Sequence, residues 1–276
     1  YAVDLEDLQK RFGFHPHAID DCRRFDQRAK LEAFSDHWFW VFHGAALGAS
    51  DEVEFSEVHA FLVGRWIVTV HQGEVQPIEK LAQQWGVQSP VARGSFPGSP
   101  VLAWTRILDA LVTQHAEVLA KLSDRLEEID DEITTRLKAG QIDKVHQLKM
   151  NLKSMRRLLA PQVEYLRAVV DGRMPVASSP EERLDLRAAK DHAQLLVEKL
   201  DLALEATLSI RESYAVAATL ASNRIIGRLT AFLVVFLPIT FVTGFFGMNF
   251  TQIPYGDTAW LVFAIAFILV APVAVL

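Results

Sequence analysis

The sequence predicts an α+β N-terminal domain, followed by long helices that continue into two membrane-spanning helices at the C-terminal end. Three observations lead to this fold class. Segments rich in aromatic and β-branched residues occur before about residue 97, where they alternate with short helical patterns. From residue 98 to about residue 228, the apolar residues follow helical spacing without strand patterns. After Arg228, Asp257 is the only charged residue.

The N-terminal domain, residues 1–97, is expected to begin with two short helices and to continue with strands. Helical apolar spacing occurs in "VDLEDLQKRFGF" and "HPHAIDDCRRF", whereas "HWFWVFHGAAL", "FSEVHAFLVG" and "RWIVTVHQG" have the composition of strands. A helix from about Val75 to Trp85 follows these strands. The stretch from Val87 to Pro100 is rich in Gly, Pro and Ser, and it is therefore expected to be a loop.

Residues 98–180 predict a long helical hairpin. Amphipathic spacing continues from Val101 to Leu137, and "AGQ" interrupts it near Gly140. A second helix is expected to run to about Val170, because "DGRMPVASSP" then breaks the helical pattern.

Residues 181–247 predict one uninterrupted helix that enters the membrane. At a rise of 1.5 Å per residue such a helix is roughly 100 Å long, and it requires partner helices because helices are not stable in isolation. Apolar and small residues recur at spacings of three and four along it: Leu186, Ala189, Ala193, Leu196, Leu200, Ala203, Thr207, Ile210 and Tyr214. This narrow stripe favours several copies of the chain packed around an axis.

Two apolar runs have the length of membrane spans. A span requires about 20 mostly apolar residues, and the runs from Leu229 to Gly247 and from Thr258 to Leu276 contain no charged residue. Buried core helices of a soluble protein are the alternative, but two uncharged runs so close together are typical of membrane proteins. Residues 248–257 are then a short hairpin loop, with Pro254 and Gly256 as turn residues.

The arginines indicate how the spans are oriented. Arg211, Arg224 and Arg228 precede the first span, whereas the loop at 248–257 carries no basic residue. The positive-inside rule then places residues 1–228 and the chain end in the cytoplasm, and the loop outside. We therefore expect a multi-pass protein of the plasma (inner) membrane.

Composition argues against several other functions. A net charge of −6 and a pI of about 5.9 do not favour a nucleic-acid partner. Cys22 is the single cysteine, so the chain has no internal disulfide.

We recognise no Ser/His/Asp or Cys/His arrangement and no Gly-rich phosphate loop, so neither catalysis nor a cofactor is expected. His15 and His17 are interpreted as part of the domain structure, and the acidic run at 127–132 as a solvated helix face.

One face of the first span differs from the rest of that segment. The face is polar at its start, apolar in its middle and small at its end: Asn223, Ile226, Thr230, Leu233, Leu237, Thr240, Gly244 and Gly247. Polar groups in a membrane face protein or water, so this face would line a pore if several copies surrounded an axis. Helix-packing contacts explain the small residues equally well. The hydroxyl of Thr240, taken alone, is expected to bond to the backbone.

The tripeptide "GMN" ends the first span and is followed by a short loop and one last span. Together with "NRIIGRLT", "LPITFVTG", "FGFHPHAIDD" and "QRAKLE", it resembles the CorA-type divalent-cation (magnesium) transporter superfamily over essentially the whole chain. The resemblance implies a funnel-shaped homopentamer in membrane lipid, with stalk helices below a pore lined by the first span. It implies an external ion filter of Gly247, Met248 and Asn249, and pore-lining positions at Asn223, Leu237, Thr240 and Gly244.

The function that this resemblance implies is passive influx of Mg²⁺, with Co²⁺ and Ni²⁺ as further divalent ions. Leu233 and Leu237 are candidates for a hydrophobic gate, because apolar constrictions close pores by dewetting. The loop after "GMN" has Asp257 as its only acid, where magnesium members often carry more. Zinc transport, as in the ZntB-type branch, therefore remains an alternative, and a non-transporting, membrane-tethered coiled-coil scaffold is a third.

Regulation is also implied by the resemblance. Magnesium members of the family close when Mg²⁺ occupies acidic sites between cytoplasmic domains. In this sequence Asp185 and Asp191, on the predicted stalk helix, are the candidates for such a regulatory metal site.

Overall fold

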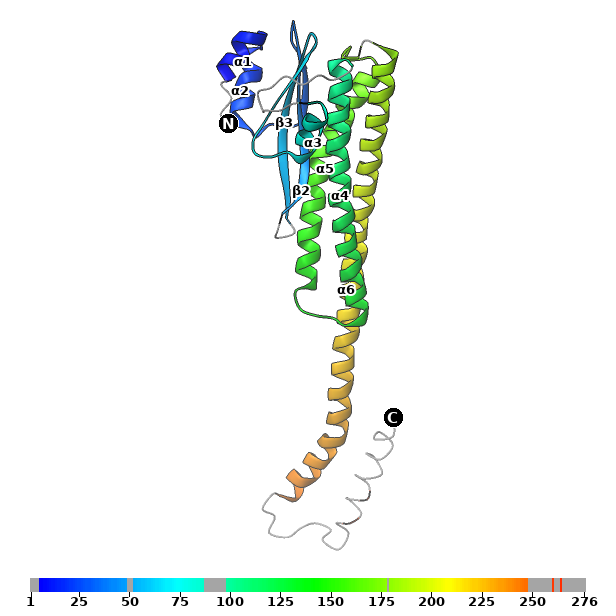
Figure 1. Cartoon of the computed structure of the whole chain (residues 1–276). Coiled ribbons are helices and arrows are strands. Elements are labelled where there is room, and N and C mark those ends of the chain that lie inside the picture. Colours follow the sequence, from blue (N-terminus) through cyan, green and yellow to red (C-terminus); the bar gives the residue numbers. More distant parts are fainter. Residues whose placement is uncertain are drawn as a thin grey trace. The chain divides into compact units, whose positions relative to one another are not determined.

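The computed structural model describes residues 5–48, 52–86, 98–177, 179–247, 260 and 264 (Figure 1). The chain divides into two compact units, residues 1–211 and residues 212–276. Within the part described, the order of elements is two helices, four strands and four further helices.

The first unit begins with helices α1 (Leu5–Phe12) and α2 (Pro16–Arg24) and continues with an antiparallel sheet. The strands lie side by side in chain order: β1 (Lys30–Ala33), β2 (Trp38–Leu47), β3 (Val53–Val63) and β4 (Trp66–His71). Helix α3 (Gln76–Gln84) follows. The predicted helices and the three predicted strands are confirmed, whereas β1 was not predicted because four residues are too few for a recognisable alternation.

Both faces of the sheet are covered by helices (Figure 1). On one face Phe39 and Phe61 belong to a buried cluster with Phe14 and Ile19, which come from the segment of α1 and α2. On the opposite face α4 packs on the sheet, where the ring of Trp104 meets Trp40 edge to face at 5.7 Å between centroids. Because both faces are covered, β2 is buried over most of its length instead of at every second residue.

Three long helices follow: α4 (Pro100–Thr135), α5 (Gln141–Val170) and α6 (Pro180–Phe246). Helix α6 belongs to the first unit up to residue 211 and continues into the second. Ser99 caps α4, since its Oγ accepts a hydrogen bond from the Leu102 N–H at 3.2 Å. Pro100 is therefore the first residue of a helix and not part of the predicted loop, which suits proline because the first helical N–H has no partner. The predicted break at Gly140 is confirmed, with a left-handed φ of 86°.

A capping box starts α6. The Ser179 Oγ accepts from the Glu182 N–H at 3.1 Å, and Glu182 Oε2 accepts from the Ser179 N–H at 3.0 Å. Such reciprocal bonds satisfy two donors that a helix start otherwise leaves free.

The apolar stripe of α6 has a different partner from the one expected. From Leu186 to Ile210 its members are buried within the single chain. Helices α4 and α5 supply the contacts: His192 Nδ1 lies 2.9 Å from Asp109 Oδ1 of α4, and Arg156 of α5 donates to Asp201. The prediction that this stripe joins several copies around an axis was therefore wrong for these residues. Helical spacing identifies a buried face but not the chain that buries it.

The second unit contains the C-terminal part of α6. This helix is the one described element that is long and apolar enough to cross a membrane, with a mean hydropathy of 1.7 over its best 18 residues. None of that window is buried. The predicted loop at 248–257 and the predicted second span lie outside the described residues, apart from Trp260 and Ala264.

Candidate functional site

The predicted pore face lies on one continuous helix. Every position from Asn223 to Gly244 falls within α6, which passes Gly227 and Pro238 without ending. At 3.6 residues per turn the chosen positions share one side of the helix. Their apolar members are uncovered in the chain, with Ile226 56%, Leu233 48% and Leu237 69% exposed. This face is thus available for contact with water or with another helix.

The hydroxyl groups of this face are already satisfied by the helix backbone. Thr230 Oγ1 donates to the Ile226 carbonyl at 2.9 Å, and Thr240 Oγ1 donates to the Phe236 carbonyl at 2.8 Å. The expected backbone bond of Thr240 is confirmed. Each hydroxyl oxygen still has a lone pair for a further hydrogen bond, so these side chains offer acceptor oxygens without an unpaired donor.

The two glycines at the end of the face differ in their surroundings. A Cβ added to Gly244 would meet nothing within 4 Å, whereas one on Gly247 would lie 3.0 Å from the Thr243 carbonyl oxygen. The Gly247 N–H donates to that same carbonyl at 2.9 Å. Met248 and Asn249, the other residues of the predicted filter, lie outside the described residues.

The predicted regulatory acids lie on α6 in the first unit, and each is close to a basic side chain. Asp185 Oδ2 is 3.7 Å from Arg106 Nη2, and Asp191 Oδ1 is 2.5 Å from Lys190 Nζ. Among the residues that the structure describes, no three His, Cys, Asp or Glu side chains form a group able to hold a metal. One chain therefore does not complete a site at Asp185 and Asp191 from those residues.

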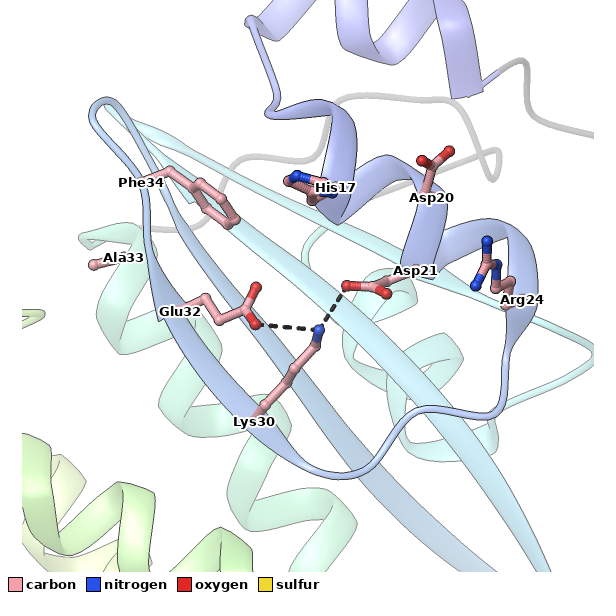
Figure 2. A pocket seen from close by; sticks show the side chains of 8 residues that line it. All are labelled: His17, Asp20, Asp21, Arg24, Lys30, Glu32, Ala33 and Phe34. Atoms are coloured by element: carbon pink, nitrogen blue, oxygen red, sulfur yellow. Dashed lines mark hydrogen bonds and ion pairs between the residues drawn. The ribbon is translucent and has the colours of Figure 1, made fainter.

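An open pocket of about 600 Å³ lies between α2 and β1 (Figure 2). Its carboxylates are occupied by a lysine: Lys30 Nζ is 2.6 Å from Asp21 Oδ2 and 3.2 Å from Glu32 Oε1. Burial alone would lower the pKa of Lys30, but the hydrogen bond to Asp21 and the charge of Glu32 outweigh it and raise the pKa. The ammonium group fills the position that a cation would need between these carboxylates.

Comparison with known proteins decides the family. The model of the family described as "CorA-like Mg2+ transporter protein" matches residues 2–276. The chain belongs to this CorA-like family. It is a CorA-family metal ion transporter and not an enzyme.

Individual relatives agree with this assignment. YfjQ of Bacillus subtilis (strain 168) is 30% identical over 247 residues, which are 90% of this chain and 75% of that protein. The cobalt/magnesium transport protein CorA of Thermotoga maritima is 23% identical over 250 residues, covering 90% and 70%. The solved CorA magnesium transporter of Methanocaldococcus jannaschii shares the fold, with a TM-score of 0.82 and 18% identity over 98% of this chain and 85% of that one.

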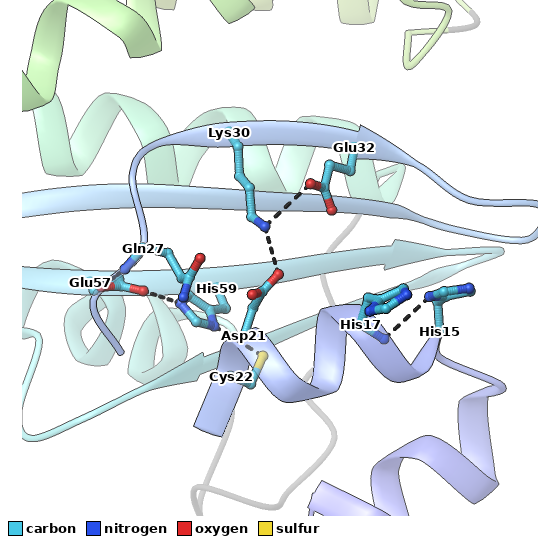
Figure 3. A network of polar contacts seen from close by, with 9 residues as sticks. All are labelled: His15, His17, Asp21, Cys22, Gln27, Lys30, Glu32, Glu57 and His59. Atoms are coloured by element: carbon cyan, nitrogen blue, oxygen red, sulfur yellow. Dashed lines mark hydrogen bonds and ion pairs between the residues drawn. The ribbon is translucent and has the colours of Figure 1, made fainter. Parts of the chain in front are cut away.

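This CorA-family chain also contains a buried Cys–His–carboxylate arrangement (Figure 3). His59 Nδ1 lies 3.0 Å from Cys22 Sγ, and His59 Nε2 contacts Glu57 Oε1. Glu57 in turn accepts a hydrogen bond from the Gln27 N–H at 3.0 Å. This arrangement is not readable from local spacing, because Cys22 is on α2 and its partners are on β3. The available signal was the spacing of Glu57 and His59, which puts both on one face of a strand.

The environment of Cys22 explains why this arrangement is not a catalytic centre. The thiol is 1% exposed and His59 is 0% exposed. Burial, reinforced by the charges of Asp21 and Glu57, raises the pKa of Cys22 to about 12. The thiolate is the nucleophile in cysteine chemistry, and at neutral pH this sulfur stays protonated and out of reach of a substrate. The three side chains therefore act as packed polar core.

Proposed function

We propose that this protein is a homopentameric channel for passive Mg²⁺ influx, with its pore lined by the polar and small face of α6. The observation that carries the proposal is that this face, from Asn223 to Gly244, is continuous on one helix and uncovered in the single chain. Membership of the CorA-like family supports a transported metal ion. An ion of this class would enter at Gly247, Met248 and Asn249 and leave past Asn223.

The chemistry of the face suits a hydrated divalent cation. Mg²⁺ dehydrates reluctantly and keeps several of its waters when bound. Neutral oxygens accept hydrogen bonds from those waters, but they attract the ion less strongly than a ring of carboxylates would. The proposed acceptors are the amides of Asn223 and Asn249 and the hydroxyl oxygens of Thr230 and Thr240. Weak binding allows the ion to leave, which conduction requires. A dication that moves inward across the membrane gains about 4.6 kcal/mol per 100 mV, so no ATP is needed.

The apolar middle of the face supplies the proposed gate. Leu233 and Leu237 lie one helical turn apart on the pore face, and both are about half exposed or more. In a ring of five copies, their side chains would form two successive apolar constrictions, from which water is expelled when the pore is narrow. Opening then requires only a small outward movement of α6.

The proposed topology places residues 1–228 in the cytoplasm, the first span at about 229–247, the loop at 248–257 outside and the second span at 258–276. The exposed apolar surface of α6 supports the first span, and the arginines before it support the orientation. Asp185 and Asp191 are the proposed regulatory metal ligands. Asp191 is exposed and Asp185 is partly exposed, and the one basic side chain near each leaves carboxylate oxygens for an ion shared with another copy.

Flux into vesicles containing the purified full chain tests this function. An inside-negative potential should drive Mg²⁺ influx, reported by an internal dye, and Asn249→Ala should abolish it. Gln252→Ala is the matched control, because it removes an amide from the same loop but outside "GMN". The same vesicles should be presented with Co²⁺, Ni²⁺ and Zn²⁺ in competition.

Each outcome separates the candidate functions. Mg²⁺ influx that disappears with Asn249→Ala supports the proposal. Zn²⁺ influx that excess Mg²⁺ does not reduce would assign the protein to zinc transport. No flux of any divalent ion from correctly inserted protein would leave only a scaffold role.

A further inference from the structure

Two arginines beside the apolar part of α6 have no protein partner in the part of the chain that the structure describes. Arg224 and Arg228 are both exposed and lie one helical turn apart, so their side chains project from the same side. Between Glu212 and Asp257 the sequence contains no acidic residue. The pair is thus an uncompensated positive patch immediately before an uncharged segment.

This patch and the proposed pore face lie on different sides of α6. On a helix with 3.6 residues per turn, Arg224 and Arg228 lie roughly opposite the face from Asn223 to Gly244. Continuing along the same side, α6 presents Phe232, Val235 and Ile239, of which Phe232 is 53% and Ile239 48% exposed. Basic side chains followed by exposed apolar side chains are typical of a helix that passes from the lipid headgroups into the hydrocarbon core of a bilayer.

We propose that Arg224 and Arg228 bind the phosphate groups of anionic phospholipids in the cytoplasmic leaflet. This inference rests on the orientation in the proposed function, which places both arginines on the cytoplasmic side. Lipid phosphate is the occupant of matching charge at this depth. The guanidinium group of arginine can donate two parallel hydrogen bonds to one phosphate group, one from each of two nitrogens.

The distances along the helix support a headgroup contact. Arg228 directly precedes the apolar run, and Arg224 lies roughly 6 Å further back along the axis at 1.5 Å per residue. The headgroup region on each side of a bilayer is of a similar thickness. Each basic residue near an anionic surface strengthens binding by roughly fivefold, so the pair should favour an anionic over a zwitterionic lipid by roughly 25-fold per site.

Native mass spectrometry of the full chain measures this preference directly. The purified protein is titrated with phosphatidylglycerol and, separately, with phosphatidylcholine of identical acyl chains, and bound lipids are counted. The test variant is Arg224→Gln with Arg228→Gln. The matched control is Arg211→Gln, which removes a charge from the same helix more than three turns earlier. A parallel titration adds soluble glycerol 3-phosphate as competitor.

The proposal predicts a preference for phosphatidylglycerol in the wild-type chain and in Arg211→Gln, and its loss in the double variant. It also predicts that glycerol 3-phosphate does not displace the lipid. An unchanged preference in the double variant, no preference in the wild type, or displacement by glycerol 3-phosphate would each overturn it. Because lipid counting does not depend on ion flux, a chain that binds phosphatidylglycerol but conducts no Mg²⁺ would contradict only the proposed channel.

Discussion

Acidification should destabilise the N-terminal unit through His115, which is held neutral in the core. This side chain is 0% exposed on α4. Its Nδ1 lies 3.0 Å from the Leu111 carbonyl oxygen, to which it donates, whereas its Nε2 is buried without a partner among the residues described. Burial lowers the pKa of His115 to about 4, and the hydrogen bond to Leu111 opposes this only in part. Protonation would place a positive charge in the core and a proton on Nε2 that has no acceptor among the residues described.

The size of the effect follows from the difference in pKa between the two states. An unfolded chain protonates this histidine at a pKa of about 6.5, whereas the folded chain does so near 4. The unfolded state therefore binds more protons between these values, and the free energy of unfolding falls as pH decreases from about 6.5 to about 4. The full loss is about 3 kcal/mol, of which about 2 kcal/mol is reached at pH 5. Above pH 7 the stability is fully present.

Urea unfolding of the detergent-solubilised chain at pH 8 and pH 5 measures this loss through tryptophan fluorescence, since Trp104 is buried on the same helix. In His115→Phe the loss between the two pH values should shrink by about 2 kcal/mol, because the ring no longer titrates. Its stability at pH 8 should fall by about 1 kcal/mol for the lost hydrogen bond. His146→Gln, which alters an exposed histidine, is the control. An equal pH dependence in His115→Phe and the wild type would refute the reasoning.

Two predictions concern the proposed channel. Leu237→Ser should raise resting Mg²⁺ leak into vesicles, by about tenfold if it lowers the dewetting barrier by about 1.4 kcal/mol; a leak equal to wild type would remove Leu237 from the gate. Asp185→Asn combined with Asp191→Asn should weaken inhibition of influx by Mg²⁺ on the cytoplasmic side, seen as a higher half-inhibiting concentration. Unaltered inhibition would show that regulation resides elsewhere.

Much of the fold could be predicted because its elements are long or strongly patterned. The break at Gly140 and the strand β2 were readable from local residues, since a left-handed glycine and a run such as "HWFWVFHGAAL" have few alternatives. Strand β1 was not, because its four residues gain their structure from pairing with Trp38 to Val41. The spacing of residues within a segment does not show which other strand will pair with it.

The candidate site likewise contains some features that the sequence predicts and others that it does not. The α6 face was predictable because one helix carries all of its positions from Asn223 to Gly244. Two other features depend on contacts between distant segments: the burial of the stripe from Leu186 to Ile210 against α4 and α5, and the contact of Cys22 with His59. Residues on separate elements become neighbours only through the tertiary fold.

The claim that α6 lines the pore is tested most directly by two alanine substitutions at glycines. A Cβ at Gly244 or at Gly227 meets nothing within 4 Å, so the single chain tolerates both changes. Gly244 lies on the proposed pore face, whereas Gly227 lies roughly 90° away around the helix. The account predicts that Gly244→Ala reduces Mg²⁺ influx into vesicles at least about tenfold, a barrier increase of about 1.4 kcal/mol, and that Gly227→Ala conducts like the wild type. Equal influx through the two variants would contradict it.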